Sequence, residues 1–183
     1  FCTWNTEVAE TALQVASDLR APVILMAGPG EFPLLSPPRL GGIVRTLAAD
    51  FNVPAALHLD HGDSPALVNE CIAAGFTSVM LDYSTRPFDE NVAALRQVVA
   101  TARPQGVTVE GEIGAVGRVD DSTTEGSVDS TLTNPDEAAR YAELTGVDCL
   151  AVSIGNAHGI YTRLPVFDFE RLERIRRAVP VPL

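Results

Sequence analysis

The sequence predicts an α/β fold in which parallel strands alternate with helices. Three observations support this prediction. Short apolar runs of strand type alternate with longer amphipathic segments along the chain. The apolar runs lack a polar/apolar alternation, which is typical of parallel strands covered by helices on both faces. Polar residues gather where several of these runs end, and parallel α/β folds bind ligands at that end of their strands.

The order of the elements follows from this alternation. Strands are expected at residues 22–26, 53–59, 77–81, 107–113 and 148–154. Helices are expected at residues 5–19, 39–50, 64–74 and 88–102, from residue 134, and at residues 168–178. Ser64-Pro65 and Asn134-Pro135 mark two of the helix starts, because each pairs a capping residue with proline at the first helical position. Phe1 and residues 179–183 are interpreted as parts of two further strands.

A closed (β/α)₈ barrel needs eight strands, and five full strands with two terminal pieces are expected here. One prediction for the fold class is therefore α/β, a TIM barrel that is incomplete and lacks its C-terminal βα units. Residues 1–183 are expected to form a single domain. The alternative is an open, doubly wound sheet. Its nucleotide-binding version has little support, since the chain contains no GxGxxG motif and no P-loop.

Composition excludes several classes of partner. The formal net charge is −11, which argues against nucleic acid. No apolar run reaches about 18 residues and no signal peptide is visible, so no membrane partner is expected. The cysteines Cys2, Cys71 and Cys149 show no disulfide or CxxC spacing. This indicates a reducing compartment, and we expect a cytoplasmic protein.

All three histidines follow or end a predicted strand. His58, Asp60 and His61 end one strand, Asp82 follows the next, and His158 comes after a third. On the strand at 107–113, Glu110 and Glu112 share one face because strand side chains alternate. Since the carboxyl ends of parallel strands meet at one rim, these side chains are expected to gather there.

This set of residue types suits a metal. His61 and His158 offer imidazole nitrogens, which zinc accepts. Asp82 and Glu112 are candidates for further ligands or for groups that orient the ligands. Two histidines do not complete a catalytic zinc site, which usually has about three protein ligands. Asp60 adjoins His61 and could act on a substrate that the metal holds.

The motifs resemble those of the class II, metal-dependent aldolases of fructose and tagatose bisphosphate. Five stretches carry the resemblance in order: residues 1–5, Leu57-His-Leu-Asp-His-Gly62, Ser78-Val-Met-Leu-Asp-Tyr-Ser84, Val109-Glu-Gly-Glu-Ile-Gly114 and residues 145–161. Together they cover nearly the whole chain.

The resemblance implies roles for single residues. His61 and His158 are implied as two of three zinc ligands, and Asp82 and Glu112 as carboxylates at the metal. Asp60 is implied as the catalytic acid/base. Asn5 and Gly159 are implied as substrate contacts. Zn²⁺ is the implied cofactor, with a monovalent cation (Na⁺ or K⁺) as a second candidate.

The resemblance also implies an activity. The protein is expected to be an aldehyde-lyase of carbohydrate metabolism, in glycolysis, that cleaves fructose or tagatose 1,6-bisphosphate reversibly. The products are dihydroxyacetone phosphate and glyceraldehyde 3-phosphate, formed by zinc enediolate chemistry, and the assembly is expected to be a homodimer or homotetramer. Two alternatives stay open: a class II aldolase for a related keto-sugar phosphate, or a non-catalytic metal-binding barrel if the chain is truly 183 residues long.

Several features depart from the family pattern. A third histidine before Gly-Gly-Ser-Gly, and an Asn-x-Asp-Thr stretch, are absent from these residues. Asp120 is a second catalytic candidate, but it stands where many relatives carry the longer glutamate. Residues 114–133 form an unusually long connection, which we interpret as a lid over the substrate. His58 fits either a core histidine or the rim, and the arginines between residues 171 and 177 are interpreted as a solvated helix face.

Overall fold

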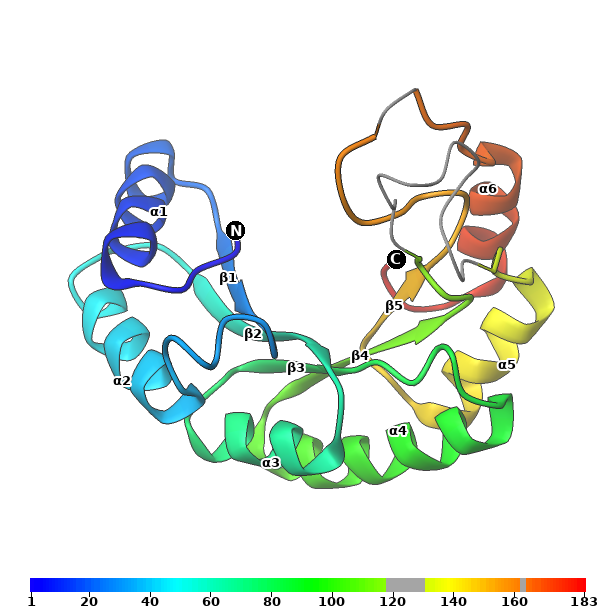
Figure 1. The fold of residues 1–183 in the computed structure, drawn as a ribbon, viewed down its shortest axis with the longest axis horizontal. Helices are drawn as coiled ribbons and strands as arrows, with labels where there is room; N and C mark the ends of the chain where they lie inside the picture. Colours follow the sequence, from blue (N-terminus) through cyan, green and yellow to red (C-terminus); the bar gives the residue numbers. More distant parts are fainter. Residues whose placement is uncertain (118–130, 162–163) are drawn as a thin grey trace. The chain divides into compact units, whose positions relative to one another are not determined.

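A computed structural model describes residues 1–117, 131–161 and 164–183 (Figure 1). In order, its elements are α1 (Thr6–Leu19), β1 (Val23–Ala27), α2 (Pro37–Ala48), β2 (Ala55–Gly62), α3 (Pro65–Ala73), β3 (Ser78–Leu81), α4 (Phe88–Ala102), the 3₁₀ turn η1 (Arg103–Gln105), β4 (Thr108–Ile113), α5 (Pro135–Thr145), β5 (Cys149–Val152) and α6 (Phe169–Ala178). None of the helices in the described ranges combines the length and the apolar character that a membrane span requires. Two compact units emerge from the contacts: residues 1–82 with 98–109, and residues 83–97 with 110–183.

The first unit is a parallel sheet with helices packed along it. β1 pairs with β2, and β2 pairs with β3, all in parallel. Helix α1 packs on β1 and on α2, while α3 packs on β2 and β3 (Figure 1). The first residues of the chain run beside β1, because the Met26 N–H donates to the Phe1 carbonyl at 2.9 Å and the Thr3 N–H donates to the Met26 carbonyl at 2.8 Å. The expected strand at Phe1 thus takes the form of a short parallel pairing on the edge of β1.

The second unit repeats this construction. β4 and β5 pair in parallel, with Glu110 opposite Cys149 and Glu112 opposite Ala151. Helices α5 and α6 pack side by side (Figure 1). The Leu150 N–H donates to the Pro182 carbonyl at 3.0 Å, so residues 179–183 run next to β5. They are not a strand as expected, since Pro180 and Pro182 have no N–H to donate to a ladder.

The strand order is β1-β2-β3-β4-β5. The order follows the chain, and the pairs β1–β2, β2–β3 and β4–β5 are parallel and joined by helices, as neighbouring strands are in a (β/α) barrel. These five strands are part of the eight that a closed barrel requires. The prediction of an α/β, incomplete TIM barrel is confirmed.

Local signals in the sequence set where the helices begin. Asn134 caps α5, because its Oδ1 accepts the N–H groups of Asp136 and Glu137 at 2.9 and 3.3 Å. Ser64 caps α3 through the Leu67 N–H. Helix α2 begins at Pro37, earlier than the periodicity indicated, because prolines are tolerated in a first turn whose N–H groups have no helical acceptor.

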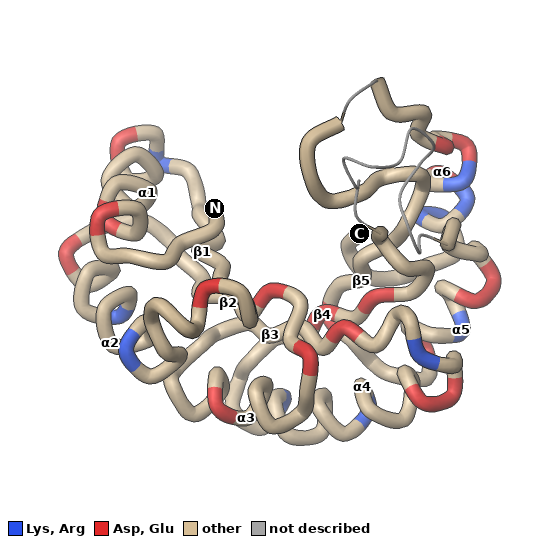
Figure 2. Tube along the Cα trace, in the orientation of Figure 1, with Lys and Arg blue, Asp and Glu red and all other residues tan. Residues whose placement is uncertain are grey.

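Two expectations need correction. β2 extends through Gly62 rather than ending at residue 59, so His58, Asp60 and His61 lie within the strand. The arginines of α6, seen as blue segments in Figure 2, are not all solvated. Arg171 donates from Nε to Asp168 Oδ2 at 2.9 Å and from a terminal nitrogen to the Thr133 carbonyl at 3.0 Å. Asp168 caps the same helix through the Arg171 N–H, which makes Arg171 part of a structural junction.

Candidate active site

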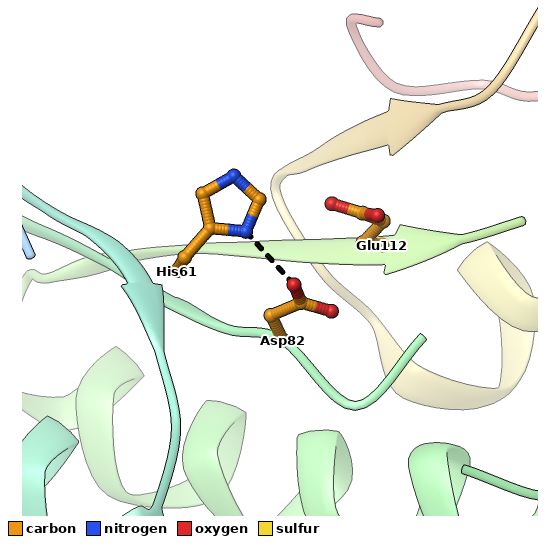
Figure 3. Close-up of side chains that lie close together, drawn as sticks. All are labelled: His61, Asp82 and Glu112. Atoms are coloured by element: carbon orange, nitrogen blue, oxygen red, sulfur yellow. Dashed lines mark hydrogen bonds and ion pairs between the residues drawn. The ribbon is translucent and has the colours of Figure 1, made fainter. Parts of the chain in front are cut away.

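His61 and Asp82 meet at the carboxyl ends of two neighbouring strands. His61 lies near the end of β2 and Asp82 directly follows β3. The His61 Nδ1 lies 2.8 Å from Asp82 Oδ2 (Figure 3). A carboxylate can only accept, so this contact places the proton on Nδ1 and the lone pair of the ring on Nε2. Metal-binding histidines are commonly oriented by a carboxylate in this way.

The backbone of His61 adopts an unusual conformation. Its φ is +46°, in the left-handed region that residues with a Cβ seldom enter. The pairing of β2 with β3 is irregular between Leu59 and Gly62. This irregularity redirects the chain at the point where the imidazole must turn toward Asp82. Backbone strain of this kind costs about 1–3 kcal/mol and clusters at functional sites.

Glu112 completes a group of potential metal ligands. It lies on β4 with a relative exposure of 1%, and its Oε1 accepts the Val116 N–H at 3.0 Å. One ligand atom from each of His61, Asp82 and Glu112 lies within 4.8 Å of the others (Figure 3). Among the described residues this is the only such group of three. An imidazole nitrogen with carboxylate oxygens is a donor set that zinc and other divalent metals accept.

His58 takes the structural alternative that the sequence left open. It is 4% exposed, and its Nδ1 lies 2.8 Å from the Ser78 hydroxyl on β3. Burial lowers the pKa of His58; Asp60 nearby acts in the opposite direction, and His61 adds a smaller lowering effect. His58 is therefore a core histidine that stays neutral, and it is not part of the ligand group.

His158 and Gly159 lie in the exposed segment after β5. The His158 N–H donates to the Gly117 carbonyl at 2.9 Å. His158 is not part of the group that His61, Asp82 and Glu112 form, so its role as a metal ligand stays a prediction. Gly159 has a φ of +107°, a conformation open to glycine and strained for other residues. Its proposed contact with a phosphate also stays a prediction.

The comparison with protein families decides the identity of this chain. The family model of class II fructose-bisphosphate aldolase matches residues 1–183. The chain belongs to this family.

Solved structures of aldolases share the fold. The YdjI aldolase from Escherichia coli K12 is 34% identical, with a TM-score of 0.87 over 100% of this chain and 64% of its own. A protein from Coccidioides immitis with a provisional fructose-1,6-bisphosphate aldolase assignment is 29% identical, with a TM-score of 0.84 over 97% of this chain and 62% of its own. The fructose-bisphosphate aldolase of Campylobacter jejuni shares the fold at 23% identity, with a TM-score of 0.75 over 97% of this chain and 58% of its own. The chain thus spans less than two thirds of the length of each.

Membership in a metal-dependent aldolase family agrees with the ligand group. His61, Asp82 and Glu112 supply one nitrogen and two carboxylates, and all three come from motifs that carried the resemblance. Asp60, the implied acid/base, lies on β2 next to His61 and is partly exposed.

Two other predicted site residues have different outcomes. Asn5 caps α1, because its Oδ1 accepts the Val8 N–H at 2.9 Å. This role was not predicted, although an asparagine just before a helical run is a capping signal. A contact between Asn5 and substrate stays a prediction. Asp120 and most of the expected lid lie outside the described residues.

Proposed function

We propose that the protein containing this chain is a zinc-dependent aldehyde-lyase that cleaves a ketose 1,6-bisphosphate, fructose or tagatose, reversibly into dihydroxyacetone phosphate and glyceraldehyde 3-phosphate. The observation that carries the proposal is the grouping of His61, Asp82 and Glu112, with Asp60 adjoining His61 in a family of class II aldolases. A bound divalent metal supplies Lewis-acid stabilisation of negative charge on substrate oxygens.

The residues of the chain have distinct tasks in this proposal. His61 presents Nε2 toward the metal while Asp82 holds the proton on Nδ1. Glu112 presents a carboxylate, one oxygen of which is already engaged by the Val116 N–H. His158 is proposed as a second imidazole ligand, and Asn5 and Gly159 as substrate contacts.

Asp60 is proposed as the general base. It would remove the proton from the C4 hydroxyl of the substrate as the bond between C3 and C4 breaks, and return it in the condensation direction. A covalent route through a lysine imine has no candidate here, because the 183 residues contain no lysine. All 13 of the residues counted as Lys or Arg are arginine, whose guanidinium stays protonated and does not form such imines.

The decisive experiment separates metal binding from turnover. Asp60→Ala should bind Zn²⁺ as the wild type does and lose most of its cleavage of fructose or tagatose bisphosphate, because general-base catalysis contributes about 10²–10⁴-fold. Asp63→Ala is the matched control, since it removes an exposed acid three residues along the chain. Turnover by Asp60→Ala equal to that of Asp63→Ala would contradict the proposal. Turnover measured on a panel of fructose bisphosphate, tagatose bisphosphate and related keto-sugar phosphates identifies the substrate.

A further inference from the structure

The chain after β4 touches two of the proposed metal ligands. The Val116 N–H donates to Glu112 Oε1 at 3.0 Å, and the Gly117 carbonyl accepts the His158 N–H at 2.9 Å. One short stretch therefore fixes an oxygen of the Glu112 carboxylate and the backbone of His158. Any displacement of residues 115–117 would move both. What holds this stretch in place consequently matters for the site.

Thr133 holds the first residues after β4 in place. Its side chain is fully buried, and its Oγ1 donates to the Ile113 carbonyl at 2.5 Å and accepts the Ser153 N–H at 2.8 Å. The hydroxyl thus joins the carboxyl end of β4 to the residue that follows β5. Gly114, with a φ of +77°, packs so closely on Thr133 that a Cβ at this position would collide with it. The turn after β4 is therefore shaped around the Thr133 side chain.

Thr131 anchors the next residue. The Ala115 N–H donates to Thr131 Oγ1 at 3.0 Å, and the Thr131 N–H donates to the Ala115 carbonyl at 3.0 Å. Arg171 adds a bond from α6 to the Thr133 carbonyl at 3.0 Å. Residues 131–133 are in this way fixed from α6 and in turn fix residues 113–115.

We propose that Thr133 and Thr131 are positioning residues that hold residues 113–117 in the conformation from which Val116 and Gly117 set the orientation of Glu112 and His158 for a metal. This inference rests on the proposed role of these two residues at the metal. Groups that orient metal ligands without binding the metal themselves typically contribute about 10–100-fold to metal affinity.

The test measures the affinity for Zn²⁺ alone by competition with a chromogenic chelator. Thr133→Val keeps the shape of the side chain and removes the hydroxyl, and we expect it to raise the dissociation constant for Zn²⁺ by about tenfold or more. Thr133→Ser keeps the hydroxyl and should restore most of the affinity. Thr145→Val is the matched control. Thr145 is also buried, at 4% exposure, and its hydroxyl donates to the Tyr141 carbonyl at 2.7 Å.

Equal Zn²⁺ affinity of Thr133→Val and Thr145→Val would overturn the proposal. If Thr133→Val does not fold, Thr131→Val takes its place, because Thr131 is exposed and its loss should not prevent folding. Wild-type affinity in Thr131→Val would then count against a positioning role.

A second measurement, hydrogen exchange of the Val116 amide in metal-free protein, separates this inference from the proposed function. Faster exchange in Thr133→Val than in Thr145→Val supports the positioning role even if the wild type shows no cleavage. Equal exchange in the two variants contradicts it. Wild-type protein that binds Zn²⁺ without cleaving a sugar bisphosphate would refute the proposed function alone.

Discussion

The imidazole of His61 and the carboxylate of Asp82 lie 2.8 Å apart, between Nδ1 and Oδ2, although 21 positions separate them in the sequence. The pairing of β2 with β3 brings them together. The imidazole is 31% exposed and the carboxylate 24%, so both are partly shielded from water. This contact selects the tautomer of His61 and holds the orientation of its ring. The site therefore depends on a carboxylate even where the imidazole is the ligand.

Removing the Asp82 carboxylate should weaken metal binding. Asp82→Ala should raise the dissociation constant for Zn²⁺ by about 10–100-fold, because His61 loses the group that fixes its tautomer and orientation. Asp82→Asn should lose less, since the amide oxygen still accepts from Nδ1–H. Chelator competition measures both constants. Asp50→Ala removes an exposed acid elsewhere; if it weakens binding as much as Asp82→Ala, overall charge explains the effect and orientation does not.

The left-handed backbone of His61 predicts that a substitution at this position can remove metal binding without lowering the stability of the fold. Glycine adopts this conformation freely, whereas an L-residue bears a cost of about 1–2 kcal/mol. The free energy of unfolding of His61→Gly should therefore lie within about 1 kcal/mol of the wild-type value, although the contact with Asp82 is lost. The same variant should lose metal affinity. His61→Val should be clearly less stable than His61→Gly, because a β-branched residue fits this conformation poorly. Urea denaturation of the metal-free proteins compares the two.

Arg20 provides a comparison at a helix end outside the proposed ligand group. It ends α1 with a φ of +53°, and glycine is the preferred residue at such a left-handed helix end. We expect Arg20→Gly to raise the free energy of unfolding by about 1 kcal/mol with no change in metal affinity. Unchanged or lower stability in this variant would show that the left-handed conformation is not a significant cost here.

The three cysteines should differ in reactivity. Burial, with an added contribution from the charge of Glu70, raises the pKa of the Cys71 thiol to about 12. Burial and then Glu110 raise the pKa of the Cys149 thiol to about 12 as well. Cys2 is exposed. Because the thiolate is the reactive form, iodoacetamide should label Cys2 first in the folded protein, and mass spectrometry of the peptides reads the order directly. Labelling of Cys71 or Cys149 before Cys2 would contradict this.

Most of the fold could be predicted from the sequence, because local and repetitive signals encode it. The strands at 77–81 and 107–113 differ by about one residue from β3 and β4. The cap at Asn134 is present as predicted. Apolar runs separated by capped helices specify parallel crossover units regardless of tertiary detail, so the α/β class followed from the pattern, while the choice of a barrel over an open, doubly wound sheet came from the family resemblance.

The contacts between side chains within the site were harder to predict from the sequence. The extension of β2 through His61 depends on the irregular pairing with β3, a tertiary feature without a sequence signature. The partner of His58 is Ser78, 20 positions away, and periodicity does not identify such a pair. Thr133 ends the connection at residues 114–133 that was interpreted as a lid, yet it is buried between the ends of β4 and β5. Only a contact between distant segments could reveal its role.

His58 makes a final prediction about pH. Burial holds the pKa of this imidazole below its ordinary value of 6.5, mainly because the charged form would lose its hydration. The unfolded chain keeps the ordinary value, so the unfolded state binds more protons once the pH falls below about 6.5. The contribution of His58 to stability is therefore complete above that pH and is lost progressively as the pH falls toward the lowered pKa of the folded state.

The measurement is urea denaturation of metal-free protein at neutral pH and near pH 5, for wild type and for His58→Gln. Gln lacks a titrating group but retains polar atoms that can bond to Ser78. Wild type should lose more stability on acidification than His58→Gln does, and NMR should show the His58 ring titrating below the ordinary histidine range. Equal losses in the two proteins, or a His58 ring that titrates at or above the ordinary value, would contradict a neutral, buried imidazole at this position.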